Sequence, residues 1–594
     1  MKLIIKEYLA SLREREELDA VLPDLLSQMG MNVFSRPKRG TRQDGVDVAA
    51  VGSIVGEEET VYLFSVKPGD LRRADWNSDS PQSLRPSLDA IQDTYIRNRL
   101  PQEHSEKKIK ICICVGGDIR EEVRQDIEGY KDRYRNERVS FEEWNGDKLA
   151  HLIESYFLRE EFLPKAARSQ LRKAIALIDE PDTSYKHFIV LVDLILGGKV
   201  VKADQKIQAI RQLSICLWIL FAWARERGNL ESTYLAAEIL LLRLWQLVRE
   251  YAEKGDKTAK SINSVYQVVL NTYRSVGKEF FEKTVIPHAS KFHGLSNAVF
   301  SSTSLDINLK LFDLAGRTAL YGLWIRMYAD SFPEGSEQQM VLSRFRTYAG
   351  TIKELINNNP ILLLPIKDEQ CIDVALCVLV LLMNGDKESI KTWLTQVMNR
   401  AVFAYKFSKS YPCNISAYHE LLEHPQLDEI YRKNATVGSI LYPFISILAS
   451  ITDEKELGAA VQTFKREELQ HCNFQYWYPD DSSENHIYVN DAIHGATLSG
   501  INVEVAPRDL LSQIFDECEN MRQYWELSAV KHGFWPLVLT ACRHYRLPVP
   551  LHLFQQYWTL TKDTSFESAP NADAERVCVT SELTSDCPET EDIV

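Results

Sequence analysis

A chain of 594 residues is too long for one hydrophobic core and predicts about three domains. Hydrophobic residues (45%) and charged residues (26%) occur at globular frequencies. The net charge of −14 excludes a surface that is positive throughout, so any contact with nucleic acid must be local.

The sequence contains neither a typical signal peptide nor an apolar run long enough to cross a membrane. The longest such run, Leu213 to Ala224, is shorter than the ~20 residues that span a bilayer and is typical of a buried core helix. The eleven cysteines form no CxxC pair, which is typical of reduced thiols. We therefore expect a cytoplasmic protein without a membrane segment.

Helix and strand patterns alternate over residues 1–160 and predict an α/β domain. The first helix ends in a glycine, and the strand-like runs are rich in Val, Ile, Tyr and Phe. The expected elements, in chain order, are a helix at 16–30, strands at 31–37, 45–55 and 60–67, a helix at 81–100, a strand at 108–115, a helix at 119–136, a strand at 139–144 and a helix at 146–156.

Residues 165–561 show apolar residues at helical spacing in long runs joined by short polar links. This pattern predicts a large all-α region, with possible breaks at 330–335 and 473–490. We expect it to act as a sensor, an oligomerisation surface or a scaffold. Residues 562–594 are rich in Asp, Glu, Ser and Thr, and they predict an acidic disordered tail.

Two consecutive predicted strands carry residues suited to phosphodiester hydrolysis. Asp47 stands in the run GVDV and Lys67 in the run FSVK. Hydrolysis needs a hard divalent cation held by oxygen ligands and a positive side chain that orients water or neutralises the phosphate. Such a pair alone is more typical of a surface ion pair, but the order of the surrounding elements favours a site.

The run QDGVDVAAVG, a short hairpin and VYLFSVKPGD resemble the Mrr-like branch of the PD-(D/E)XK restriction-endonuclease superfamily, in which a GxD strand precedes a strand ending in (D/E/Q)xK. The runs ELDAVLPDLLSQMG and VSFEEWNGDKLAHLI are similar to its first helix and to its closing strand and helix. The resemblance covers the N-terminal domain only. It implies a restriction-endonuclease-like fold, an endonuclease that uses Mg²⁺ or Mn²⁺, and a role in restriction or antiviral defence.

The same resemblance assigns roles to individual residues. It implies that Asp47 binds the metal and that Lys67 positions or activates the attacking water. It also implies an acidic ligand from the first helix. The spacing back from Gly30 favours Asp19, with Glu16 one turn earlier as the alternative.

Ser65 departs from the family pattern, which has Glu, Asp or Gln two residues before the lysine. A neutral hydroxyl is a weaker ligand for Mg²⁺ than a carboxylate. Two interpretations stay open. Either the enzyme tolerates Ser65, with a carboxylate supplied from elsewhere such as Asp70, or the domain has lost catalysis and binds nucleic acid or a partner as a scaffold. Asp44 is predicted to be a turn residue rather than a ligand.

Basic residues flank the proposed site and are candidates for holding nucleic acid, here expected to be double-stranded DNA. Arginines on both sides of a carboxylate pocket suit the phosphate backbone, although a solvated charged loop explains them equally well. The start of a helix also favours phosphate. The candidates are Arg36, Lys38, Arg39, Arg42, Arg72, Arg73, Gln82 and Arg85. A homo-oligomer or a partner subunit is expected to assemble through the helical region.

Overall fold

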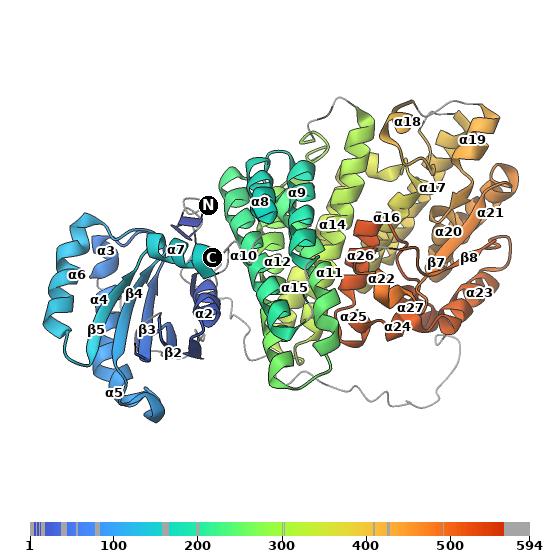
Figure 1. The fold of residues 1–594 in the computed structure, drawn as a ribbon. Helices are drawn as coiled ribbons and strands as arrows, with labels where there is room; N and C mark the ends of the chain where they lie inside the picture. Colours follow the sequence, from blue (N-terminus) through green and yellow to red (C-terminus); the bar gives the residue numbers. More distant parts are fainter. Residues whose placement is uncertain are drawn as a thin grey trace. The chain divides into compact units, whose positions relative to one another are not determined.

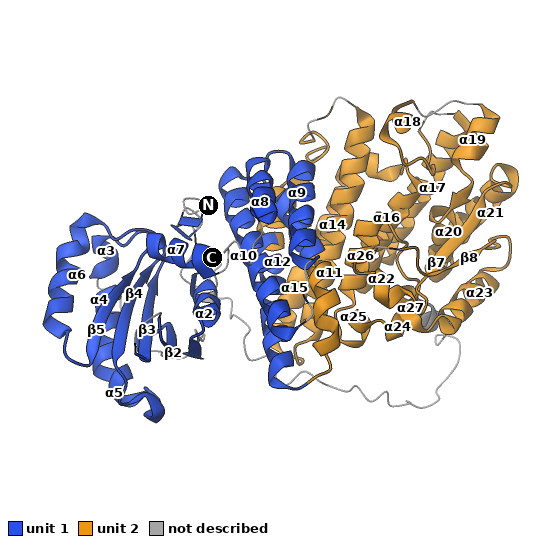
Figure 2. Ribbon diagram, in the orientation of Figure 1, with its two compact units in different colours: residues 1–240, 255–276, 585–594 blue, residues 241–254, 277–584 orange. Residues whose placement is uncertain are grey.

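The computed structural model describes residues 18–36, 44–54, 58–77, 83–156, 165–197, 202–299, 303–407, 410–423, 428–490 and 492–562, together with positions 5, 6, 9, 10, 12, 200 and 301. Residues 563–594, where the sequence predicts an acidic tail, lie outside them. The chain forms two compact units, residues 1–240 with 255–276 and residues 241–254 with 277–562 (Figure 2).

A five-stranded mixed sheet organises the N-terminal part, as the sequence predicts (Figure 1). Its strands lie in the order β1-β2-β3-β4-β5. The first three pair antiparallel, and β3, β4 and β5 pair parallel. The strands are β1 (Asn32–Ser35), β2 (Val48–Gly52), β3 (Thr60–Lys67), β4 (Ile109–Val115) and β5 (Val139–Trp144).

The central strand β3 is buried along all eight residues, because helices cover both faces of the sheet. On one face, Leu63 of β3 and Ile111 of β4 share an apolar core with Leu88 and Ile127 from the covering helices. The helices of this domain are α2 (Asp19–Gln28), α3 (Arg73–Trp76), α4 (Leu84–Ala90), a π-helical turn (Ile91–Tyr95), α5 (Ile96–Asn98), α6 (Glu121–Tyr134) and α7 (Gly146–Tyr156). The predicted helix over 81–100 therefore contains a π-helical turn that its sequence did not reveal.

The rest of the chain is mostly helical, as predicted. Its longer helices are α8 (Lys165–Ala176), α9 (Pro181–Leu196), α10 (Ala203–Arg227), α11 (Glu231–Val248), α12 (Lys257–Thr284), α14 (Ser304–Asp330), α15 (Ser336–Asn358), α16 (Cys371–Met383), α17 (Lys387–Phe407), α20 (Leu441–Ile451), α21 (Lys455–Glu467), α23 (Pro507–Asn520), α26 (Pro536–Tyr545) and α27 (His552–Lys562). Shorter helices are α13 (Ile286–Ala289), α18 (Tyr418–Glu423), α19 (Glu429–Ala435), α22 (Ser483–His486), α24 (Gln523–Glu526) and α25 (Ser528–Lys531).

The prediction that residues 165–561 are all helical is wrong in one respect, because they also contain a small β-sheet. A three-stranded sheet forms from β6 (Gly438–Ser439), β7 (Asn473–Tyr478) and β8 (Ala496–Ser499). The run NFQYWY of β7 is rich in aromatic residues, which favour a pleated, half-buried surface over a helix. The break predicted at 330–335 matches the link between α14 and α15, whereas the one at 473–490 contains β7.

Helix α10 has the length and composition of a membrane-crossing helix, alone among the described residues. Within the protein, 78% of its apolar window is buried. Leu213, Leu217 and Leu220 of this helix are completely buried, as expected of a core helix.

The turn before β2 depends on a glycine. Gly45 has a φ of +83°, which L side chains rarely adopt, and a Cβ atom there would lie 2.0 Å from the carbonyl oxygen of Ser87 in α4. Gly30 has a similar φ of +86°, but nothing lies within 4 Å of the position that its Cβ would take.

The Gly45→Ala substitution should therefore destabilise the N-terminal domain more than Gly30→Ala does. Both add backbone strain, but only Gly45→Ala forces two backbones apart, at a further cost of about 2 kcal/mol or more. Calorimetric unfolding of the two full-length variants measures the difference. Equal destabilisation would show that the close approach to Ser87 is unimportant.

A buried carboxylate in the second unit joins two segments that are distant in sequence. Asp368 accepts hydrogen bonds from the Ser439 hydroxyl (2.5 Å) and from the backbone amide of Ile440 (2.8 Å), at the start of α20. Burial raises the pKa of this carboxyl to about 6, even though these donors oppose the rise.

The folded protein should therefore gain stability from Asp368 as the pH falls through 6, because the folded state then binds a proton that the unfolded state does not. Relative to Asp368→Asn, the wild-type free energy of unfolding should rise by about 1 kcal/mol between pH 7.5 and pH 5. Urea unfolding of both proteins at several pH values tests this. A constant difference between them would contradict the raised pKa.

Candidate active site

Asp47 lies just before β2 and contacts the end of the neighbouring strand β3, which contains Ser65 and Lys67. The start of β2 and the end of β3 lie at the same edge of the sheet, because the two strands are antiparallel. The Asp47 amide donates to the Phe64 carbonyl (2.9 Å), and Asp47 Oδ2 accepts from the Val66 amide (2.7 Å). The carboxylate thus lies against the backbone between Ser65 and Lys67.

The bond from Asp47 to Phe64 is one residue out of register, since Val48 is the residue that pairs with Phe64. Such an irregularity resembles a β-bulge, which re-aims a side chain and often occurs beside active sites. Here the Asp47 carboxylate takes the place of a backbone acceptor. Its charge adds to the effect of burial in raising the pKa of Cys114, on the neighbouring strand β4.

Ser65 is almost completely buried, with 1% of its surface exposed. Among the described residues its hydroxyl oxygen has no hydrogen-bond partner. An unsatisfied buried hydroxyl costs about 1–3 kcal/mol, so it requires an explanation. Strand alternation places Ser65 on the same face of β3 as Lys67.

Lys67 is the last residue of β3 and is only 7% exposed. Lysine is rarely buried to this extent in proteins unless its charge is compensated. Its carbonyl accepts from the amide of Gly116, at the end of β4 (3.4 Å). The site therefore lies at the carboxyl ends of the parallel strands, where ligands commonly bind in open α/β sheets.

Both carboxylate oxygens of Asp70, the candidate for an additional acidic ligand, are engaged in contacts within the domain. One of its oxygens accepts from the Asp118 amide (2.8 Å) and the other pairs with Arg120 (2.5 Å). These contacts, led by the Asp118 bond, lower the pKa of Asp70. Both oxygens thus link the loops that follow β3 and β4.

Two other aspartates at this edge are paired with a lysine from the N-terminal segment. Lys6 contacts Asp147 (2.8 Å) and Asp118 (3.0 Å). These hydrogen bonds, Asp147 first, raise the pKa of Lys6. Nearby, a Cβ at Gly116 would lie 2.2 Å from the Leu9 carbonyl, so the N-terminal segment packs closely on the end of β4.

The described residues at this position offer a single carboxylate, that of Asp47, to a cation. In the described part of the chain, no three His, Cys, Asp or Glu side chains are grouped to hold a metal ion. Mg²⁺ is commonly bound by one or two carboxylates together with waters and substrate phosphates. Asp47 would supply one carboxylate, beside the unsatisfied hydroxyl of Ser65. Asp19 is a buried residue in the first turn of α2, and Glu16 lies outside the described residues.

Of the predicted nucleic-acid contacts, Arg72, Arg73 and Arg36 are exposed and Arg85 is half-buried in the first turn of α4. Arg72 and Arg73 begin α3, shortly after Lys67. Four further candidates lie outside the described residues, namely Lys38, Arg39, Arg42 and Gln82.

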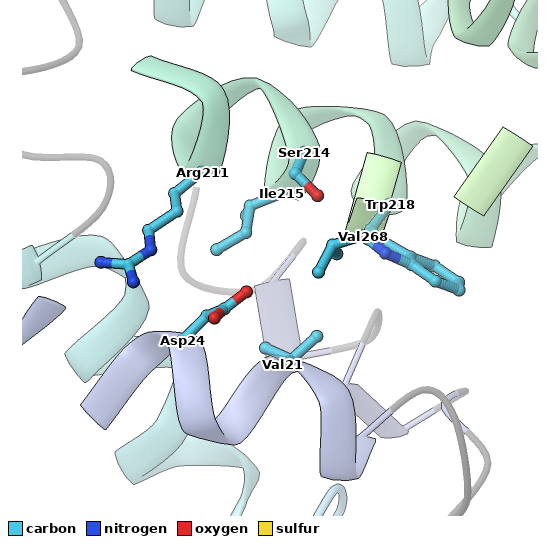
Figure 3. Close-up of a pocket in the computed structure, with 7 residues that line it drawn as sticks. All are labelled: Val21, Asp24, Arg211, Ser214, Ile215, Trp218 and Val268. Carbon is cyan, nitrogen blue, oxygen red and sulfur yellow. The ribbon is translucent and has the colours of Figure 1, made fainter. Parts of the chain in front are cut away.

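Arg36 lies close enough to Asp24 for its charge to oppose the rise in the pKa of that carboxyl, which burial causes. Asp24 and Arg211 line a cavity of about 20 Å³ in the first unit (Figure 3). A cavity of this size admits a water molecule and no substrate. Asp24 in α2 and Arg211 in α10 are distant in the chain, so no local sequence pattern reveals that they line one cavity.

Comparisons with known proteins leave the family open. The sequence matches no protein-family model, and no curated protein or solved structure is significantly similar to it.

The Ser65→Ala substitution should leave the stability of the chain unchanged or slightly raised, because it removes a buried hydroxyl that makes no hydrogen bond. Thermal unfolding of the full-length variant measures this. A loss of about 1 kcal/mol or more would mean that the hydroxyl has a structural partner.

Proposed function

We propose that the N-terminal domain is a metal-dependent endonuclease that hydrolyses phosphodiester bonds in double-stranded DNA, in the service of restriction or antiviral defence in the cytoplasm. The observation that carries the proposal is the contact of the Asp47 carboxylate with the Val66 amide, directly between Ser65 and Lys67. It brings an acidic group to the segment of β3 that ends in a buried lysine.

The surrounding fold supports the same function. An antiparallel hairpin followed by a parallel crossover places both residues at one edge of a rigid, two-sided sheet, which limits their movement. The exposed arginines at the start of α3 follow Lys67 by a few residues and suit phosphate contacts outside the site.

In this function Asp47 would hold Mg²⁺ or Mn²⁺, with Asp19 or Glu16 as the proposed second acidic ligand. The bound cation would supply charge stabilisation and a more acidic water. Lys67 would position that water or neutralise the phosphate. Burial of Lys67 strengthens its electrostatic interaction with a phosphate, because the local dielectric constant is low.

The second candidate function is a scaffold or nucleic-acid-binding protein whose nuclease fold no longer catalyses. Ser65 favours it, since the family pattern has a carboxylate or amide there. The contacts of Asp70 with Asp118 and Arg120 favour it as well, because they engage the carboxylate that could otherwise replace the one absent at Ser65. Under this function the protein binds DNA and leaves it intact.

Purified full-length protein should cleave supercoiled or linear DNA when Mg²⁺ or Mn²⁺ is present. Asp47→Asn and Lys67→Ala should each lower the rate by at least about 100-fold, because one removes the ligand charge and the other the positive side chain. Gel assays with both DNA forms, and with single-stranded DNA, measure the rates.

The matched control is Asp126→Asn, which removes an exposed carboxylate on α6, away from the site. This variant should cleave like the wild type. Equal cleavage by all four proteins would point to a contaminating nuclease and defeat the assignment. The scaffold function would be favoured if the protein bound DNA but did not cleave it, and if calorimetry showed no Mg²⁺ binding that depends on Asp47.

A further inference from the structure

The turn that precedes Asp47 carries an ion pair to the end of the helical segment that runs from α4 to α5. Asp44 has a φ of +49°, and its carboxylate lies 2.6 Å from Nε of Arg99. The Asp44 side chain is 4% exposed, whereas that of Arg99 is 43% exposed. A buried carboxylate on a residue in the left-handed region thus meets an arginine that reaches in from the surface.

The helical segment that ends just before Arg99 also touches this turn at a second point. Gly45 lies against the carbonyl of Ser87 in α4, at the other end of the same helical segment. Between the two contacts, the π-helical turn at Ile91–Tyr95 shifts the residues that follow it around the helix axis. Its last residue, Tyr95, is hydrogen-bonded to Ser35 at the end of β1.

A positive φ costs a non-glycine residue about 1 kcal/mol, and aspartate tolerates this conformation better than most residues. Burying a carboxylate adds a further cost unless a positive charge compensates it. The ion pair with Arg99 offsets the cost of burying the Asp44 carboxylate. Asp47 follows Asp44 by three residues. The conformation of the turn at Asp44 therefore determines the direction in which the Asp47 side chain points toward β3.

We propose that Arg99 is a positioning residue for Asp47 and acts through Asp44, so that the helical segment from α4 to α5 sets the place of the carboxylate at the end of β3. The inference rests on the proposed function, because holding Asp47 matters there for binding the cation. The effect of Arg99 on the hydrogen bond between Asp47 and Val66 can be measured whether or not the protein cleaves DNA.

The test uses full-length Arg99→Gln and Asp44→Asn, because asparagine tolerates a positive φ and thus removes only the charge. Hydrogen exchange of the Val66 amide, resolved by fragmentation mass spectrometry, reports its bond to Asp47. Exchange should be about tenfold faster in both variants, while amides of β4 and β5 keep their protection. The double variant should add little, because the two side chains form one pair.

The matched control is Arg97→Gln, which alters an exposed arginine on the same helical segment. It should exchange like the wild type at Val66, and Arg99→Lys should restore most of the protection. In cleavage assays, Arg99→Gln should raise the Mg²⁺ concentration for half-maximal rate by about tenfold and leave the rate at saturating Mg²⁺ nearly unchanged.

The proposal is overturned if Val66 exchange does not change in Arg99→Gln, or if the whole sheet loses protection together, since Arg99 would then stabilise the fold in general. Failure of the wild type to cleave DNA or to bind Mg²⁺ would instead defeat the proposed nuclease. The exchange at Val66 would still decide whether Arg99 positions Asp47.

Discussion

The hydrogen bond from the Val66 amide to the Asp47 carboxylate is the contact on which the candidate site depends. The Asp47 carboxylate accepts a hydrogen bond that a backbone carbonyl would accept in a regular ladder. Its position is therefore tied to the backbone of β3. A charge-assisted bond of this kind is stronger than a neutral one. The arrangement joins the two strands and orients the acidic group at the same time.

Much of the N-terminal fold was predictable from the sequence because its signals are local. The strands at 60–67 and 139–144 and the helix at 146–156 have the predicted bounds, since β-branched and aromatic runs or helical apolar spacing mark them directly. Asp44 lies in a turn, as predicted, and Gly45, predicted to begin a strand, belongs to the same turn because β2 begins only at Val48.

What the sequence did not show depends on contacts between distant residues. The π-helical turn at Ile91–Tyr95 occurs in residues that suit an ordinary helix equally well, and Arg99, which pairs with Asp44, follows it. The role of Asp70 likewise depends on Asp118 and Arg120, some fifty residues away. Strand β7 lies in the segment 473–490, which the sequence marks as a break between helices and not as a strand.

The nine cysteines in the described part of the chain are all buried and form no disulfide. For Cys112 and Cys114 of β4, complete burial raises the pKa of the thiols, so the reactive thiolate is suppressed while the sheet stays closed. An alkylating reagent can therefore modify them only when the strand opens. The rate at which these two native cysteines are alkylated therefore reports how often the sheet beside the candidate site opens, without an engineered cysteine.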